Sequence, residues 1–487
     1  MTSNLDRRAR THLLREDGQE DVCFATYAPS TGAMRTTAVL NDLVLPSRGE
    51  RQVHGNVSFS GSYVVRAASM AASQGLGIAL MHSHPDGAGW QGMSLVDHTT
   101  EHSYARLAET ITGYPLVGMT LAGDKTWSAR KWHVDRGPHD AESVRIVGTK
   151  LQVSWNHRHR PGPVSTTAQV RTVSAWGEAM QANLVRLRVL VVGVGTVGVD
   201  VAIRLVQAGV QHVAVMDFDT VELINLDRLL SATRLDAALH RSKVAVALRA
   251  MRAASTALEP VLAGHDLSVC EPAGETMALD YDVIFSCVDR PWPRAVLNQL
   301  AYSDLIPVVD GGLAVEPFVD GGMRNATWRA HVVTPGRPCM QCSGQISGAQ
   351  VARDRAGLLD DETYIRTAGL RPPSRENVSL LAPAVTAAML GQFVSLTVAP
   401  GGLGVPEPLR FSLSSHTLEH LPVETSAGCT YEDATGCGDR RPSLVKEHPA
   451  AEITRQNRAH RARRASVRVR RFGQDMLEAA ARVIKLC

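Results

Sequence analysis

The sequence predicts an α/β protein in which a mixed α+β domain precedes a domain built on a mostly parallel sheet. Two observations predict this. The chain has 487 residues, more than one ordinary core holds, so two or three domains are expected. Residues 188–219 have the pattern strand, glycine turn, helix and strand, which is the βαβ unit of parallel sheets.

The first domain is expected over residues 1–150, where strands and helices alternate. Three apolar runs bounded by turn or polar residues are typical of strands: "DVCFATYAP", "LGIALMHSH" and "PLVGMTLAG". Between the last two, "VDHTTEHSYARLAETI" has helical spacing. A connector is expected over residues 151–165, where Gly, Pro, His and Arg mix without a clear period.

The second domain is expected over residues 166–445. After the βαβ unit, "DYDVIFSCVD" and "LIPVVDGG" add apolar strands with acidic or glycine ends. "SLLAPAVTAAMLGQFVSLTV" contains Pro, Ser, Thr and Gln, which favours a buried core helix over a membrane span. Residues 446–487 are arginine-rich and then amphipathic, which predicts a basic helical tail; a partner-docking segment is the alternative.

Composition and charge argue against several classes of protein. The net charge of +3 gives no reason to expect nucleic-acid binding. The start, "MTSNLDRRARTHLLRED", carries charges where a signal peptide needs an apolar segment. We therefore expect a cytoplasmic protein that binds neither nucleic acid nor a membrane. In that compartment the cysteines favour metal binding, catalysis or burial over disulfides.

The run "MHSHPDGAGWQGMSLVDHTTE" raises the question of a metal site. Residues two apart in a strand point to the same face, so His82 and His84 project together. Asp97 is expected on the first turn of a helix that Ser94 starts. Two imidazoles, a carboxylate and one open position make a catalytic zinc site. The alternative is a plain capping box formed by Ser94 and Asp97, beside two surface histidines.

This run resembles the JAMM (MPN-type) zinc isopeptidases, whose signature is an upstream glutamate, H-x-H-P, a loop and S-x-x-D. The resemblance implies a JAMM-type α+β domain with a catalytic Zn²⁺. The residues it implies are the ligands His82, His84 and Asp97, the general base Glu20, and Ser94 as hydrogen-bond donor to the oxyanion. The loop before Ser94 is longer than in the commonest form of the motif. Glu16 and Glu50 are near enough in the sequence to compete with Glu20.

The glycine turn "GVGTVG" lies between a strand and a helix. Gly193, Gly195 and Gly198 there allow a tight turn and the close approach of a phosphate to the helix N-terminus. A nicotinamide enzyme would show the same turn. The next strand ends in "MDFDTVELINLDR", and a nicotinamide site has no use for that asparagine and arginine at fixed spacing.

This region resembles the E1-like adenylating enzymes, which include ubiquitin-activating enzymes and the ThiF- and MoeB-type activators of sulfur carriers. Their hallmark, D-x-D-x-V-x-x-x-N-L-x-R after the glycine turn, is matched at every position. The resemblance implies a Rossmann-like domain that binds ATP and Mg²⁺. The residues it implies are Asp217, Asp219, Asn225 and Arg228, with Lys243 on the ATP phosphates and Asp289 positioning Mg²⁺. Arg171 resembles the arginine that family dimers insert into the neighbouring active site.

The implied reaction is attack of a C-terminal glycine carboxylate on the α-phosphate of ATP, which gives an acyl-adenylate and pyrophosphate. Carboxylate and triphosphate repel each other, and Arg228, Lys243 and a Mg²⁺ held by Asp289 would offset that charge. The implied partners are a ubiquitin-like or sulfur-carrier-like protein ending in glycine, an E2-like protein, and a second copy of the chain, joined through the E1-like domain.

The cysteines offer a second metal site. Compact E1-like enzymes hold a structural zinc with two C-x-x-C pairs. The resemblance thus implies a four-cysteine zinc site at Cys339, Cys342, Cys429 and Cys437, although the second pair is more widely spaced. Buried cysteines without metal are the alternative. The others are Cys23, Cys270 and Cys287, expected in core strands, and the terminal Cys487, a candidate thiol acceptor. No cysteine lies between residues 343 and 428, where E1 enzymes usually carry the thioester nucleophile.

Together these features predict a bifunctional enzyme, a JAMM-like peptidase fused to an E1-like adenylating domain. Such fusions resemble components of bacterial ubiquitin-like conjugation systems that are often linked to phage defence. The same adenylate could instead receive sulfur in cofactor or metabolite biosynthesis. A binding scaffold with two inactive sites is the third alternative, against which the intact motifs argue.

Overall fold

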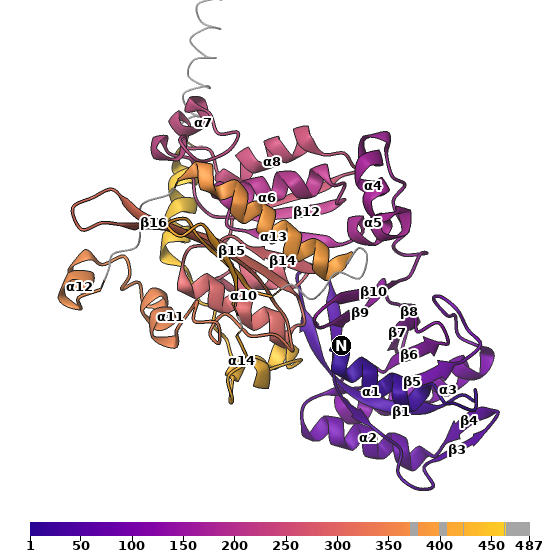
Figure 1. Cartoon of the computed structure of the whole chain (residues 1–487). Coiled ribbons are helices and arrows are strands. Elements are labelled where there is room, and N and C mark those ends of the chain that lie inside the picture. The colour runs from indigo at the N-terminus through magenta and orange to yellow at the C-terminus, as the bar shows by residue number, and fades with distance from the viewer. Residues whose placement is uncertain (371–377, 399–406, 422, 462, 464–487) are drawn as a thin grey trace, which may run out of the picture.

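The computed structural model describes residues 1–370, 378–398, 407–421, 423–461 and 463 (Figure 1). Two sheets organise the chain, one of six strands near the N-terminus and one of eight strands further along. Figure 1 shows the six-stranded unit in indigo and purple beside the larger second unit. Residues 449–461 are helical, as predicted for the start of the basic tail. Cys487 and the rest of that tail beyond residue 463 lie outside the described residues.

The six-stranded sheet has the order β2-β1-β5-β6-β7-β8, in which only β5 and β6 run parallel. Its strands are β1 (Val22–Thr31), β2 (Thr36–Val44), β5 (Gly77–His84), β6 (Val117–Ala122), β7 (Trp127–His133) and β8 (Gly137–Asp140). The hairpins are β3 (Arg51–His54) with β4 (Asn56–Phe59), and β9 (Ser143–Val147) with β10 (Leu151–Trp155). The three runs predicted as strands are confirmed as β1, β5 and β6.

Both faces of this sheet are covered, which explains why its central strands are buried along most of their length. Three helices cover it: α1 (Ser3–Leu13), α2 (Gly61–Ser73) and α3 (Leu95–Thr112). Phe24 and Ile78 pack with α2 and α3, whereas Cys23 and Ala79 pack with α1 on the other face. Alternate side chains of one strand therefore enter two cores.

The eight-stranded sheet has the order β13-β12-β11-β14-β15-β16-β17-β18. Its first five strands are parallel, as predicted, and the last three form an antiparallel extension that the sequence did not predict. The strands are β11 (Arg188–Val192), β12 (His212–Met216), β13 (Val261–His265), β14 (Val283–Ser286), β15 (Val308–Pro317), β16 (Met323–Val333), β17 (Leu409–Ser412) and β18 (Thr417–His420). In the parallel part the chain order reverses between β11 and β14. Open α/β sheets bind ligands at the carboxyl ends of the strands at such a switch point.

Helices lie on both faces of the parallel strands (Figure 1). On one face are α6 (Thr196–Gln207), α8 (Lys243–Ala254) and α13 (Ala382–Thr397), and on the other α9 (Pro272–Ala278) and α10 (Pro291–Ser303). The remaining helices are α4 (Val170–Trp176), α5 (Glu178–Val185), α7 (Arg234–Ala238), α11 (Gly348–Arg355), α12 (Glu362–Thr367) and α14 (Thr430–Asp433). The prediction of core strands for Cys270 and Cys287 is wrong: Cys270 lies in a turn before α9 and packs in the core with α9 and α10, and Cys287 follows β14 and packs against the core with α6, α8 and α13.

The long apolar stretch predicted as a core helix is a short turn followed by α13. Residues Ser379–Thr397 are long and apolar enough to cross a membrane by composition, with 39% of that window buried. Val385, Met389 and Phe393 belong to the main core of the second unit. The packing supports a core helix of a globular unit.

The predicted connector over residues 151–165 is partly wrong. Residues Leu151–Trp155 form β10, which pairs with β9. Leu151 and Trp155 pack into the core of the second unit. A two-stranded hairpin is marginally stable by itself, so β9 and β10 need this packing. The boundaries at residues 150 and 166 stay predictions.

Candidate functional sites

His82, His84 and Asp97 come together at the end of β5, as the sequence predicted. His82 is buried at 7% exposure, and His84 and Asp97 are half-buried. The Nε2 atoms of the two histidines are 3.2 Å apart. His82 Nε2 lies 3.4 Å from Asp97 Oδ1, and His84 Nε2 lies 3.5 Å from Asp97 Oδ2.

Local structure places each of these groups. β5 ends at His84, so both imidazoles leave the same face of the strand at its carboxyl end. Ser94 is the N-cap of α3, and a capping box fixes the first turn of that helix. In it the Asp97 N–H donates to Ser94 Oγ at 3.1 Å, and the Ser94 N–H donates to Asp97 Oδ2 at 2.9 Å. The two sequence interpretations, capping box and ligand, are therefore compatible.

The donor set fits a zinc ion. Zinc binds imidazole nitrogen and carboxylate oxygen at about 2.0–2.1 Å, so two ligand atoms at a tetrahedral angle lie about 3.3–3.4 Å apart. The 3.2 Å between the two imidazole nitrogens matches that spacing, and the contacts of 3.4 and 3.5 Å bring one oxygen of Asp97 to each imidazole. Three protein ligands leave a fourth position for water or substrate, as in catalytic zinc sites.

The electrostatics of the group favour an ionised carboxylate. Burial by itself raises the pKa of Asp97, but hydrogen bonds from His82 and His84 outweigh it and hold that pKa well below its usual range. The hydrogen bond to Asp97 raises the pKa of His84, and the negative charge of Glu20 adds to this effect. An anionic carboxylate beside two imidazoles is ready to receive a cation.

The negative charge of Glu20 acts on His84. The β1–β5 pairing sets Val22 opposite His82, and the Ser83 N–H still donates to the Asp21 carbonyl at 3.1 Å. The strand pairing ends there, but Glu20, two residues before Val22, lies near enough for its charge to act on His84. Among its competitors, Glu50 is held by Arg66, whose Nε donates to it at 2.8 Å, and Glu16 is exposed. Of these three glutamates, Glu20 is the one whose charge acts on His84, which favours it as the base.

Behind this group lies a buried polar network that sequence reasoning missed. Arg130 on β7 binds Glu101 on α3, one turn after Asp97, and both side chains are buried. Arg130 also donates to Thr120 Oγ1 at 2.9 Å, and that hydroxyl lies 3.5 Å from His82 Nε2. Gly118 makes room, since a Cβ there would lie 2.1 Å from Glu101 Oε2. In the sequence, only the glycine at position 118, within the apolar run of β6, indicates this close packing.

The predicted glycine turn closes between β11 and α6. Gly193 has φ of +87°, which favours glycine, and a Cβ there would lie 2.6 Å from the Cys287 carbonyl oxygen. A Cβ on Gly198 would lie 1.9 Å from the Gly193 carbonyl oxygen. Gly195 is the N-cap of α6, whose free N–H groups face the carboxyl edge of the sheet. The turn is therefore compact enough for a phosphate to approach backbone.

The acidic residues after β12 lie beside this turn. Asp217 accepts the Val194 N–H at 2.7 Å and the Asp219 N–H at 2.8 Å, so it braces the turn. Asp219 binds Lys243 Nζ at 2.7 Å. Burial lowers the pKa of Lys243, but the charges of Asp217, Asp219 and Asp289 outweigh it and raise that pKa. Lysine and carboxylates thus converge where the chain order reverses, and the donor set fits Mg²⁺, which prefers carboxylate oxygens.

Three other predicted residues are not part of that convergence. Asn225 accepts the Glu222 N–H at 2.9 Å, so it caps a short 3-10 turn. Arg228 binds Asp227 at 2.9 Å, and its Nη1 also donates to the Ile224 carbonyl. Arg171 is exposed on α4. Their functional roles stay predictions.

Three of the four predicted zinc cysteines gather. Cys339 Sγ lies 3.5 Å from Cys342 Sγ and 3.6 Å from Cys429 Sγ. Thiolates on one tetrahedral zinc at about 2.3 Å lie about 3.7–3.8 Å apart, so this group fits the ion. Cys437 is not in the group; it lies half-buried near Asp304 and Arg441. The chain enters the short helix α14 directly after Cys429, which carries Cys437 away.

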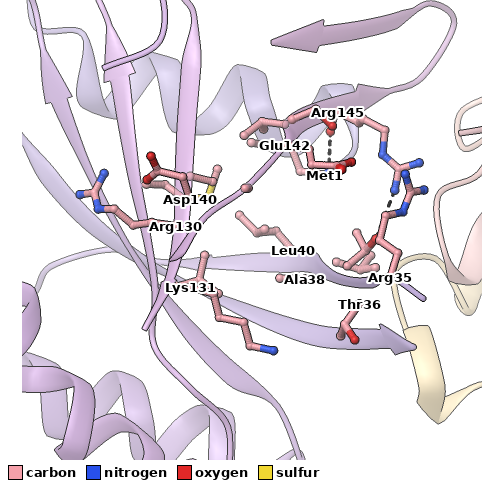
Figure 2. A pocket seen from close by; sticks show the side chains of 18 of the residues that line it. Met1, Arg35, Thr36, Ala38, Leu40, Arg130, Lys131, Asp140, Glu142 and Arg145 are labelled. Atoms are coloured by element: carbon pink, nitrogen blue, oxygen red, sulfur yellow. Dashed lines mark hydrogen bonds between the residues drawn. The ribbon is translucent and has the colours of Figure 1, made fainter. Parts of the chain in front are cut away.

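A cavity of about 320 Å³ lies between the two units, and none of its lining residues is a predicted site residue. Figure 2 shows Arg35 and Arg145 side by side, with Leu40 and Ala38 between them and Lys131. Both arginines bind Asp282 of the second unit. These two charges of the cavity therefore belong to the joint between the units.

The known proteins that are similar to this chain match its second unit. Residues 166–400 match the model of the ThiF family. The molybdopterin-synthase adenylyltransferase of Escherichia coli (strain K12) is 31% identical over 163 residues, 33% of this chain and 60% of that protein. The NEDD8-activating enzyme E1 catalytic subunit of Dictyostelium discoideum is 25% identical over 198 residues, 40% of this chain and 43% of that protein.

The sulfur carrier protein ThiS adenylyltransferase of Bacillus subtilis (strain 168) is 28% identical over 187 residues, 38% of this chain and 52% of that protein. The solved structure of E. coli MccB with succinimide is 15% identical, with a TM-score of 0.42 over 56% of this chain and 76% of that chain. The chain spans less than two thirds of the length of the relatives it matches by sequence. Residues 166–400 are thus similar to the ThiF family.

Proposed function

We propose that the ThiF-type unit, within residues 166–445, uses ATP to adenylate the C-terminal glycine of a ubiquitin-like or sulfur-carrier protein. One observation carries this proposal. The glycine turn, the Asp219–Lys243 pair and Asp289 meet at the carboxyl edge of the sheet, where its chain order reverses. The names of the relatives, which include activators of both kinds of protein, support it.

In the proposed reaction a carboxylate oxygen attacks the α-phosphorus, the new C–O–P linkage forms, and the bond to pyrophosphate breaks. The N–H groups that begin α6 would bind phosphate oxygens. Lys243, now paired with Asp219, would exchange that carboxylate for the leaving phosphates. Mg²⁺ held by Asp289 would supply further neutralisation of the triphosphate charge. Arg228 would have to turn from Asp227 to reach the same charge.

We further propose that the first unit is a JAMM-type zinc peptidase that hydrolyses peptide or isopeptide bonds after that glycine. The ligand spacing of His82, His84 and Asp97 carries this proposal. Zinc, when bound, lowers the pKa of its water to about 7 and polarises the carbonyl under attack. Glu20, whose charge acts on His84, would take the proton from that water, and the Ser94 hydroxyl would donate to the oxyanion.

We assign both activities to a bacterial ubiquitin-like conjugation system, with phage defence as its role and with a homodimer and an E2-like acceptor as partners. Sulfur transfer to a metabolite is the second candidate. The lack of a cysteine between residues 343 and 428 favours it, because an adenylating enzyme without a thioester cysteine suits direct sulfur transfer. An inactive scaffold is the third.

The proposed adenylation is tested by ATP–pyrophosphate exchange with candidate ubiquitin-like and sulfur-carrier proteins ending in glycine. Asp289→Ala and Lys243→Ala should each lower exchange by about a hundredfold or more, since each removes charge stabilisation from the transition state. Asp320→Asn, an exposed acid at the β15–β16 turn, is the control. Normal exchange in Asp289→Ala removes that residue from the role. No exchange with any such protein favours the scaffold.

A further inference from the structure

Beside the nucleotide residues, two arginines share one buried aspartate. Asp310 on β15 is fully buried and accepts a hydrogen bond from Ser286 Oγ at 2.7 Å. Arg294, near the start of α10, lies 3.4 Å from Asp310 Oδ1. Arg329 on β16 lies 3.4 Å from Asp310 Oδ2. These contacts are long for charge-assisted pairs, so neither guanidinium is fully engaged.

This cluster lies next to the glycine turn. β15 pairs with β14, which sets Asp310 opposite Ser286, and β14 in turn pairs with β11. Cys287, which follows Ser286, would touch a Cβ on Gly193, and it feels the charges of both Asp310 and Arg294. The turn therefore has the Asp219–Lys243 pair on its β12 side and the two arginines on its β15 side.

The cluster has more hydrogen-bond donors than acceptors and more positive than negative charge. Arg329 Nε is buried and has no hydrogen-bond partner within the described part of the chain, and Arg294 Nε, which is also buried, has only the 3.4 Å ionic contact with Asp310. Two guanidiniums face a single carboxylate, which leaves an excess of positive charge. The nearby Arg290 cannot change this balance, since Asp354 and Asp360 hold it. Buried donors without acceptors usually mark the place of a missing ion, water or ligand.

A glycine opens the space between the two guanidiniums. A Cβ on Gly312 would lie 3.0 Å from Arg294 Nη2 and 3.8 Å from Arg329 Nη2. Both guanidiniums therefore lie over Gly312, which has no side chain, on the same strand as Asp310. Burial and the charge of Arg294 lower the pKa of Arg329 to about 10, which a bound anion would reverse.

We propose that Arg294 and Arg329, positioned by Asp310, bind the C-terminal carboxylate of the protein that is adenylated, an inference that rests on the proposed function. The carboxylate must attack the α-phosphorus from the side opposite the leaving pyrophosphate. Lys243 and Asp219 occupy the β12 side, so the incoming carboxylate arrives from the β15 side, where the arginines lie. Two convergent forks suit a planar carboxylate.

The test measures two ligands on the full chain. The nonhydrolysable nucleotide AMP-PCP with Mg²⁺ is titrated by calorimetry. With that nucleotide present, a fluorescein-labelled decapeptide ending in Gly-Gly is titrated by anisotropy, once as the free acid and once as the C-terminal amide. The wild type should prefer the acid by about tenfold or more, as expected for a charge-assisted pair. Arg329→Gln should abolish that preference while AMP-PCP affinity stays within about twofold.

Two further variants sharpen the test. Asp310→Asn leaves both arginines uncompensated, so its preference for the acid should exceed that of the wild type. Arg410→Gln removes an exposed arginine on β17 that binds Glu419, and it should behave as wild type. If Arg329→Gln lowers thermal stability, Arg329→Lys keeps the charge without the fork and should retain an intermediate preference.

The outcomes separate this inference from the proposed function. A wild type that does not bind AMP-PCP overturns the proposed function, and this inference with it. A wild type that binds AMP-PCP but not the acid peptide, or binds acid and amide equally, overturns only this inference. So does an Arg329→Gln variant that keeps the preference. Loss of AMP-PCP affinity in that variant assigns the arginines to the nucleotide instead.

Discussion

Arg35 of the first unit donates a hydrogen bond from Nη1 to Oδ1 of Asp282 in the second unit at 2.8 Å. Arg145 donates to the same oxygen at 3.1 Å, and the Arg188 N–H donates to the other at 2.9 Å. Asp282 and Arg188 stand at the starts of β14 and β11, whose far ends lead to Asp289 and the glycine turn. The first unit therefore binds at the amino ends of the two strands whose carboxyl ends lead to the proposed nucleotide residues.

Asp282→Asn is expected to destabilise the protein by about 3–5 kcal/mol at pH 7, because it leaves Arg35 and Arg145 buried without a counter-charge. Burial raises the pKa of Asp282, but the two arginines outweigh it and hold the pKa well below its usual range. Its contribution is thus complete above the unfolded-state pKa and is lost as pH falls through the folded-state pKa. Urea unfolding between about pH 5 and pH 2 measures this slope.

The wild type should lose stability on acidification over that range, and Asp282→Asn should lose less of it. Asp320→Asn is the matched control, since Asp320 is exposed. Equal slopes in the wild type and in Asp282→Asn would show that this joint does not govern the acid sensitivity.

Gly198→Ala is expected to disrupt the glycine turn. Its Cβ would lie 1.9 Å from the Gly193 carbonyl oxygen, so α6 must move away from β11. AMP-PCP binding should fall by about tenfold or more, because the turn and the N–H groups of α6 no longer face one phosphate. The helical control is Gly391→Ala on α13, which meets no atom within 4 Å and should stabilise the chain by about 0.5–1 kcal/mol. Unchanged nucleotide affinity in Gly198→Ala would refute the close-approach role.

The features that the sequence predicts well are local. Apolar runs gave β1, β5, β6 and the βαβ unit because burial on a strand or helix leaves a period in the chain. The His82, His84 and Asp97 group was also predictable, since a strand end and a helix cap fix all three within one short segment.

Long-range pairings leave no such period. The Asp282–Arg35 joint links residues 247 positions apart, and the Asp310–Arg329 pair depends on the β15–β16 register. Cys437 looked like a ligand by its residue type, but α14 intervenes between it and Cys429. The antiparallel extension β16–β18 carries no motif that would mark its pairing order.

Cys339→Ser is expected to remove one zinc ion per chain and to lower the thermal stability of the second unit, because structural zinc contributes folding energy. Cys437→Ser should keep that zinc, since Cys437 is not among the three gathered cysteines. Elemental analysis of both variants, with thermal unfolding, decides between them. Zinc lost in Cys437→Ser would restore the four-cysteine site. Unchanged zinc in Cys339→Ser would leave a group of buried thiols.

Glu20→Gln and His84→Ala are expected to fail in different ways. His84→Ala should lose the zinc of the first unit together with all cleavage after the modifier's C-terminal glycine. Glu20→Gln should keep the zinc, because a base is not a ligand, yet lose about a hundredfold in turnover. Glu50→Gln is the control, since Arg66 holds that carboxylate. Zinc content and precursor cleavage are the measurements. Zinc loss in Glu20→Gln would make Glu20 a ligand, and a larger loss of turnover in Glu50→Gln would make that residue the base.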